Sequence, residues 1–150
     1  MIRIMFVCHG NICRSTMSEF VMKHLVRQAG ISDRVYVASS ATSYEEIGND
    51  THYGTKAVLD RHKIPYTKRA AVHLEKSDYD KYDYFIGMDD ANIRNMKKIL
   101  GKTEKIYKLL EFSGSNDSIS DPWYTGDFDA TYRDVTEGCE ALLDKIKKAL

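Results

Sequence analysis

Short apolar segments of strand length alternate along this chain with segments whose apolar residues recur at helical spacing. Strands are expected at residues 2–7, 35–39, 84–88 and 105–109, and each is followed by a loop or a helix rather than by a hairpin turn. This alternation is typical of parallel strands joined by crossover helices. It predicts an α/β fold in a single domain over residues 1–150. We expect a doubly wound, four-stranded parallel sheet with helices on both faces and functional loops at the carboxyl ends of the strands.

Helical periodicity predicts four helices, at about residues 16–29, 54–61, 90–100 and 129–150. The last is the clearest, because its apolar residues recur at spacings of four, three and four, at Val135, Cys139, Leu142 and Ile146. At the start of the first helix, Thr16 and Glu19 have the spacing of a capping box. The longest irregular stretch covers residues 113–128, and a loop of that length is often functional.

Length, charge and cysteine content narrow the classes of function. A chain of 150 residues can bury a core without disulfide or metal support. Lys plus Arg and Asp plus Glu both number 22, so no net basic charge attracts a nucleic acid. No segment has the pattern of a signal peptide or a membrane span, so we expect a cytoplasmic monomer with neither nucleic acid nor membrane as partner. Three cysteines without a Cys-x-x-Cys pair predict free thiols rather than a disulfide framework or a zinc site.

The most informative segment lies between the first predicted strand and the first predicted helix. A strand-to-helix turn points successive backbone N–H groups inward, and the helix N-terminus adds partial positive charge, so such a turn binds phosphate. Gly10 and Asn11 are residues that tolerate the positive φ of a tight turn. The residues expected around the phosphate are His9, Gly10, Asn11, Ile12, Cys13, Arg14 and Ser15.

Two residues of this segment have the chemistry of a phosphate-transfer site. Cys8 opens the loop, and a cysteine at a helix N-terminus beside arginine is held as a nucleophilic thiolate at neutral pH. Arg14 completes a Cys-x5-Arg spacing, and its planar guanidinium can hold two phosphoryl oxygens at once. The hydroxyl of Ser15 could donate to the thiolate, or it could simply cap the helix. The segment therefore predicts Cys8 as nucleophile and Arg14 as phosphate clamp.

Two motifs far apart in the chain resemble those of the low-molecular-weight protein tyrosine phosphatases. One is the loop from Cys8 to Ser15, and the other runs from Asp121 through Pro122 and Trp123 to Tyr124. The segments 39–42 and 82–89 also resemble the family, so the match covers the whole chain. The resemblance implies a phosphatase that needs no metal ion or other cofactor and acts through a phosphocysteine intermediate. Its expected substrates are phosphotyrosine proteins or small aryl phosphates.

The resemblance also implies roles for residues outside the loop. Asp121 would give a proton to the leaving oxygen and later take one from water, which contributes roughly a hundred- to ten-thousand-fold in rate. Trp123 and Tyr124 would wall the substrate pocket and stack against an aryl group. Hydrogen bonds that support the loop would come from Asn11, Ser15 and Ser39.

Several positions depart from the family pattern. His9 stands where the family usually has leucine, and we interpret it as a pocket-wall residue that tunes selectivity rather than as a metal ligand. Tyr44 is a candidate for the aromatic residue that relatives place at the mouth of the pocket, while Glu45 and Glu46 would discourage acidic phosphopeptides. Two further residues near family histidine positions, Lys68 and His62, are expected to be structural.

Cys13 lies inside the loop, and a tightly wound loop could bring it within disulfide distance of Cys8. If peroxide oxidised Cys8 to sulfenic acid, Cys13 could trap it as a reducible disulfide. Cys139 falls on the apolar face of the last helix and is expected in the core. Cys13 is therefore a candidate redox switch.

Three other functions remain open at this point. Arsenate reductase is possible because related folds use the same oxyanion loop, but that reaction normally needs two further redox cysteines. A phosphocysteine carrier would pass the phosphoryl group on without hydrolysis and would have no use for Asp121 as an acid. A catalytically dead phosphopeptide-binding module would not need Cys8, Arg14 and Asp121 together.

Overall fold

The computed structural model describes residues 1–150 and contains one sheet in which all four strands are parallel. The strands lie side by side in the order β2-β1-β3-β4, with bounds β1 (Ile2–Cys8), β2 (Val35–Ala41), β3 (Tyr84–Gly87) and β4 (Ile106–Lys108). The predicted strands are confirmed, with small shifts at their ends. Cys8 of β1 pairs with Ala41 of β2, so the two strands end together at one edge of the sheet.

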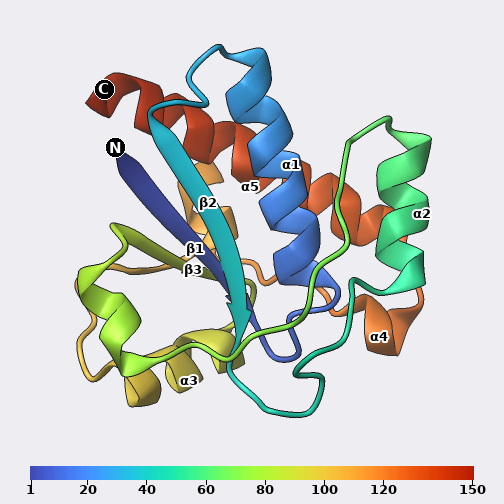
Figure 1. The fold of residues 1–150 in the computed structure, drawn as a ribbon, viewed down its shortest axis with the longest axis horizontal. Coiled ribbons are helices and arrows are strands. Elements are labelled where there is room, and N and C mark those ends of the chain that lie inside the picture. The colour runs from blue at the N-terminus through green and yellow to red at the C-terminus, as the bar shows by residue number, and fades with distance from the viewer.

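Helices cover both faces of the sheet, as Figure 1 shows. On one face α1 and α5 pack with α2 beside them, and on the other face α3 packs with the 3₁₀ turn η1. The bounds are α1 (Arg14–Gln28), α2 (Tyr53–Arg61), α3 (Asp90–Leu100), α4 (Pro122–Thr125) and α5 (Phe128–Ala149), with 3₁₀ turns η1 (Lys76–Asp80) and η2 (Leu109–Ser113). None of these helices combines the length and apolar character that a membrane span requires. The predicted doubly wound α/β fold is thereby confirmed.

Strand β1 is buried on both faces, and its alternating side chains divide between two hydrophobic cores. Ile4, Phe6 and Cys8 belong to the core beneath α1 and α5. Met5 and Val7 belong to the core beneath α3. An uninterrupted apolar run of this kind is typical of a central parallel strand. Cys8 is the last residue of β1, and the alternation directs its side chain to the face covered by α1.

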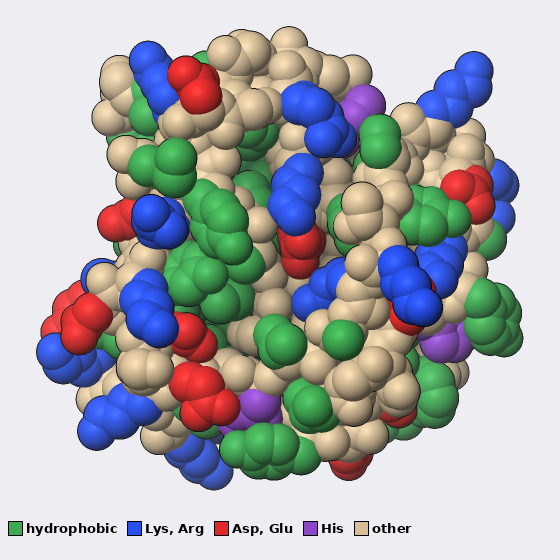
Figure 2. Space-filling model, viewed as in Figure 1, with side chains coloured by type: hydrophobic (Ala, Val, Ile, Leu, Met, Phe, Trp, Pro, Cys, Tyr) green, Lys and Arg blue, Asp and Glu red, His purple; other side chains and the backbone are tan.

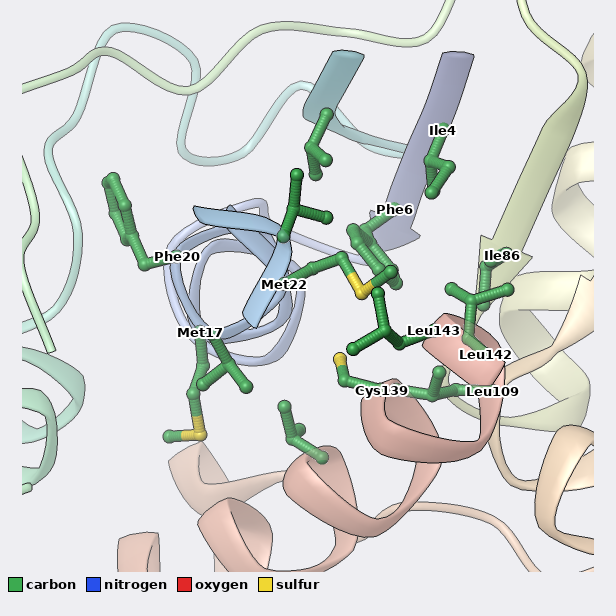
Figure 3. Close-up of a cluster of buried hydrophobic side chains, with 14 of the residues drawn as sticks. Ile4, Phe6, Met17, Phe20, Met22, Ile86, Leu109, Cys139, Leu142 and Leu143 are labelled. Atoms are coloured by element: carbon green, nitrogen blue, oxygen red, sulfur yellow. The ribbon is translucent and has the colours of Figure 1, made fainter. Parts of the chain in front are cut away.

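The larger core joins the sheet to α1 and α5. Figure 3 shows Phe6 of β1 beside Met22 of α1, with Leu143 of α5 just below them. Cys139 is fully buried among these side chains, which confirms its predicted place in the core. This packing fixes α1, and with it the end of the loop that precedes α1, against the sheet.

The start of α1 differs from the prediction. The helix begins at Arg14, two residues before the expected position, and no side chain caps it. The capping box proposed for Thr16 and Glu19 is wrong, because the Thr16 hydroxyl donates to the Cys13 carbonyl at 3.0 Å and Glu19 bonds to residues outside the helix start. The helix therefore continues directly out of the loop, and its first N–H groups belong to the loop.

The stretch 113–128, expected to be irregular, contains the short helix α4. Pro122 occupies the first turn, where a missing N–H costs nothing, and the Asp121 carboxylate caps the helix by accepting from Trp123 N at 3.1 Å. Gly126 ends the helix at φ 71°. The helix thus holds Asp121 in one place.

Close packing of α5 against η2 gives a testable prediction. A Cβ at Gly138 would lie 2.5 Å from Leu109 Cγ and 3.2 Å from the Leu109 carbonyl oxygen. Alanine favours a helix over glycine by about 1 kcal/mol, but overpacking costs about 1–3 kcal/mol. We expect Gly138→Ala to lower the free energy of unfolding in urea by about 1 kcal/mol. The control Glu140→Ala, on the exposed side of α5, should stay within about 0.5 kcal/mol. A Gly138→Ala protein as stable as wild type would contradict this packing.

Candidate active site

The loop between β1 and α1 turns its backbone N–H groups away from the rest of the protein. None of the N–H groups from His9 to Ser15 has a protein acceptor. Several carbonyls of the same loop are bonded instead: Thr42 N donates to the Cys8 carbonyl at 3.0 Å, and His52 N donates to the Ile12 carbonyl at 2.8 Å. A concave row of unpaired amides before a helix N-terminus is an anion-binding site.

Two residues allow the loop to close tightly. Asn11 is the residue in the left-handed region, at φ 60°, and Gly10 is not among the residues of positive φ. At position 10 glycine is favoured because a larger residue lacks space: an added Cβ would lie 3.3 Å from Glu46 Cγ. The prediction of a tight turn at these two residues is confirmed, and each contributes to it for a different reason.

A chain of side-chain hydrogen bonds leads from the cysteine into the protein. Ser39 donates its hydroxyl proton to the Glu19 carboxyl group at 2.6 Å. Asn11 Nδ2 then donates to Ser39 Oγ at 2.9 Å and to Ser15 Oγ at 2.7 Å. Ser15 Oγ lies 3.0 Å from Cys8 Sγ. As a thiol, Cys8 donates to Ser15 Oγ, whereas a thiolate at the same distance would accept the Ser15 proton instead.

Arg69 is a functional residue that the sequence analysis missed. Its guanidinium donates to Asn11 Oδ1 at 2.9 Å and to the Asn11 carbonyl at 3.2 Å, and Val72 N also donates to Asn11 Oδ1 at 3.2 Å. These donors fix which end of the Asn11 amide faces Ser15. Lys68, which lies near a position where the family often has histidine, is exposed. The ring of His62 stacks on the ring of Tyr132 with centroids 3.9 Å apart, and His62 takes no part in the loop.

The network ends at the free edge of β2. A hollow of about 660 Å³ runs along this edge, and Glu19, Lys23 and Arg69 are among the residues that line it. Figure 2 shows this face, where Lys and Arg side chains gather around a recessed acidic side chain. Glu19 pairs with Lys23 and lies 3.9 Å from Arg69 Nε, so its charge is balanced inside the hollow.

Arg14 is almost fully buried and is held by three oxygens. Its Nη1 donates to Asp89 Oδ2 at 2.7 Å and to the Ile119 carbonyl at 2.9 Å, and its Nη2 lies 3.4 Å from Asp121 Oδ2. Burial alone would raise the pKa of Asp89, but the hydrogen bond from Arg14 lowers it below the usual value. Asp89, which the sequence analysis gave no role, orients the guanidinium from the end of β3.

Asp121 reaches the loop from a distant part of the chain. The segment before it is attached to β3, because Ile119 N donates to the Met88 carbonyl at 2.9 Å. A cavity of about 100 Å³ joins the two regions and is lined by Cys8, His9, Gly10, Ile12, Cys13, Arg14, Glu45, Glu46, Asp121, Trp123 and Tyr124. Asp121, Trp123 and Tyr124 thus lie at one pocket with the loop, as the sequence analysis expected.

Tyr44 does not lie where the sequence analysis placed it. It is exposed and stacks on His73, with ring centroids 3.9 Å apart and planes 3° apart, and it is absent from the pocket lining. Glu45 and Glu46 line the pocket instead, and His9 Nε2 lies 3.0 Å from Glu45 Oε2. The pocket mouth is therefore polar at the position where an aromatic residue was expected.

Cys13 is buried inside the loop and lines the same pocket. Burial, followed by the nearby charges of Cys8 and Asp121, raises the pKa of Cys13 to about 12. Cys13 is therefore a protonated thiol at neutral pH.

The loop of unpaired amides follows a central parallel strand, begins at a cysteine and ends at an arginine. These features define the class of α/β proteins with an oxyanion-binding loop. Within that class, the chain belongs to the low molecular weight phosphotyrosine protein phosphatase family, whose family model matches residues 3–150. The protein is therefore a protein-tyrosine-phosphatase, a phosphoric monoester hydrolase with phosphotyrosine substrates. The resemblance drawn from the motifs is confirmed.

Relatives match along nearly the whole chain. The low molecular weight protein-tyrosine-phosphatase PtpA of Staphylococcus epidermidis is 39% identical over 150 residues, which cover 99% of this chain and 96% of PtpA. The crystal structure of YfkJ from Bacillus subtilis is 35% identical with a TM-score of 0.95, covering 99% of this chain and 96% of that one. The crystal structure of SP-PTP, a low molecular weight protein tyrosine phosphatase from Streptococcus pyogenes, is 40% identical with a TM-score of 0.87, covering 97% and 93%.

Two adjacent serines give a matched test of the supporting network. Ser39→Ala would leave an Asn11 N–H without an acceptor and would remove one of the two hydrogen bonds to Glu19, and we expect a loss of about 1–3 kcal/mol in the free energy of unfolding. The control is Ser40→Ala, because Ser40 is equally buried but its hydroxyl has no hydrogen-bond partner. Removing that unpaired hydroxyl should be neutral or stabilising. Urea unfolding measures both, and equal effects would remove the network's structural role.

Proposed function

We propose that this enzyme hydrolyses phosphotyrosine and aryl phosphate monoesters in two steps, with Cys8 as nucleophile, Arg14 as phosphate clamp and Asp121 as general acid and base. The observation that carries the proposal is the convergence on one pocket of the Cys8 sulfur, the unpaired loop amides, the buried guanidinium and the Asp121 carboxyl group. No other cavity of the protein combines these groups.

In the proposed complex, the phosphate dianion accepts hydrogen bonds from the loop amides and from Arg14. Asp89 and the Ile119 carbonyl hold one nitrogen of the guanidinium, so the clamp is oriented before the substrate arrives. Groups placed in advance around the phosphoryl oxygens stabilise the charge that develops there during transfer. The Ser15 hydroxyl lies 3.0 Å from the Cys8 sulfur, within reach to donate to the attacking thiolate.

In the first step, a sulfur lone pair of Cys8 forms the S–P bond as the bond between phosphorus and the phenolic oxygen breaks. Asp121, protonated, gives its proton to that oxygen, so tyrosine leaves as a neutral phenol. A phenol has a pKa of about 10, so protonation makes departure far easier. The product on the enzyme is phosphocysteine.

In the second step, a water oxygen attacks the phosphorus of phosphocysteine, and the S–P bond breaks. Asp121, now ionised, takes a proton from the water, and inorganic phosphate is released. The Ser15 proton aimed at the sulfur stabilises the departing thiolate. Cys8 and Asp121 both return to their starting states.

The pocket rim supports an aryl substrate. Trp123 and Tyr124 are 58% and 84% exposed, so their rings are available to stack against the substrate ring. The rim also holds the ester oxygen of phosphotyrosine at the depth of Asp121. A serine or threonine phosphate is too short to fill the same space.

Cys139 and Asp121 also bear on the alternative functions. An arsenate reductase relay would need an accessible third cysteine, and Cys139 of α5 is fully buried against α1. A phosphocysteine carrier would have no use for a carboxyl group beside the leaving oxygen, where Asp121 is held by the α4 cap. Hydrolysis therefore has more support than either.

We expect Asp121→Asn, which keeps an oxygen to cap α4, to lower kcat on a phosphotyrosine peptide by about a hundred- to ten-thousand-fold. The loss should be much smaller on 4-nitrophenyl phosphate, whose leaving group departs without a proton. Cys8→Ser should lose nearly all activity on both substrates. The control is Asp117→Asn, an exposed aspartate of the same loop. Equal losses on both substrates for Asp121→Asn would remove the acid assignment.

The proposal for Cys13 is separate. Peroxide would convert the Cys8 thiolate to sulfenic acid with release of hydroxide, and the Cys13 thiol would then form a disulfide with loss of water. We expect activity of the peroxide-treated wild type to recover with a dithiol, which reduces that disulfide. Cys13→Ser should recover poorly, because its sulfenic acid proceeds to sulfinic acid. Identical recovery of the two proteins, measured by residual phosphatase activity, would remove the redox role.

A further inference from the structure

Part of the pocket mouth is formed by the pair His9 and Glu45. Their side chains are 50% and 70% exposed, so both face the solvent from which a substrate arrives. Ser43, two residues before Glu45, joins the two segments, because it donates to the His9 carbonyl from its N at 3.1 Å and from its Oγ at 2.9 Å. Glu45 is thus held beside the phosphate-binding loop by both backbone and side-chain bonds.

Negative charge dominates the pocket lining outside the loop. Glu45, Glu46 and Asp121 all line the pocket, whereas Arg14 is the one Lys or Arg side chain among the lining residues. Arg14 is 3% exposed and paired with Asp89, so its charge acts on the phosphate and not on the rest of the substrate. Residues next to the phosphotyrosine would therefore meet carboxylates.

Glu45 can bind a cation without losing its present partner. Its Oε2 is bonded to His9 while its Oε1 has no protein hydrogen-bond partner. Glu46 is placed in the same way, with one oxygen bonded to Asn49 Nδ2 at 2.6 Å. A side chain already held in place loses little rotamer entropy when a cation binds. An incoming ammonium or guanidinium group could therefore bind to the free oxygens.

We propose that Glu45, positioned by His9 and assisted by Glu46, determines specificity by selecting phosphotyrosine segments that carry lysine or arginine next to the phosphotyrosine. The same carboxylates disfavour segments with aspartate or glutamate at these positions. The inference rests on the proposed hydrolysis at Cys8 and adds the chemical class of the substrate. It concerns binding of the flanking residues and leaves the phosphoryl transfer itself unchanged.

The expected effect is moderate because the carboxylates are exposed. One exposed ion pair changes an equilibrium by about 1.5- to 5-fold, so contacts on both sides of the phosphotyrosine predict about a tenfold contrast between basic and acidic segments. Salt shortens the screening length to about 3 Å at 1 M, so the contrast should nearly vanish there. A preference based on shape or apolar contact would not respond to salt in this way.

The test compares two phosphotyrosine peptides of equal length, one with Lys and one with Asp on each side of the phosphotyrosine in an alanine background. The measured quantity is the ratio of kcat/KM for the two peptides, taken within each protein. Wild type should favour the Lys peptide by about tenfold. Glu45→Gln, which can still bond to His9, should reduce the ratio about threefold, and Glu45→Lys should reduce it further. The control Glu140→Gln removes an exposed carboxylate on α5 and should keep the wild-type ratio.

Two outcomes would overturn the inference in distinguishable ways. If wild type hydrolyses both peptides with equal kcat/KM, or if Glu45→Gln keeps the full ratio, the specificity role of Glu45 is wrong while the proposed hydrolysis stands. If wild type hydrolyses neither the peptides nor 4-nitrophenyl phosphate, the proposed function is wrong and the inference falls with it.

Discussion

The row of unpaired backbone amides between β1 and α1 is the feature on which the rest of the site depends. An N–H without an acceptor costs about 1–3 kcal/mol when it is shielded from water, and none of the N–H groups from His9 to Ser15 has a protein acceptor. The rest of the fold offsets this cost. Neighbouring segments bond the loop carbonyls of Cys8, His9, Asn11 and Ile12, so the peptide planes cannot rotate to bury their amides. The amides therefore stay available for an anion.

The hydrogen-bond chain behind the loop connects the cysteine to Glu19. Ser39 donates its proton to Glu19, and the Asn11 amide donates one N–H to Ser39 Oγ and one to Ser15 Oγ. Ser15 Oγ in turn lies 3.0 Å from Cys8 Sγ. Arg69 strengthens the chain by fixing the Asn11 amide. A carboxyl group outside the pocket lining is thus connected to the cysteine through three side chains.

In the proposed mechanism, phosphate binding and choice of substrate depend on different parts of the structure. The proposed phosphate site consists mainly of backbone amides, which any sequence with the same turn would provide. The pocket mouth consists of exposed side chains, such as Glu45 on a loop and Trp123 on the short helix α4, which few core contacts constrain. Changes at the mouth can therefore alter substrate preference without disturbing the amides or the core.

The sequence by itself determined the sheet, its helices and the loop from Cys8 to Arg14, because strand alternation, helical period and turn-forming residues act over a few neighbouring positions. The role of Asp121 came from resemblance, since nothing local distinguishes it from other loop aspartates. The contacts of Arg69 and the displacement of Tyr44 from the pocket could not be predicted. Those contacts join segments far apart in the chain, and their geometry depends on how whole loops pack at the carboxyl edge of the sheet. Only the tertiary structure decides such long-range pairs, because many pairings have similar energies until the backbone positions are fixed.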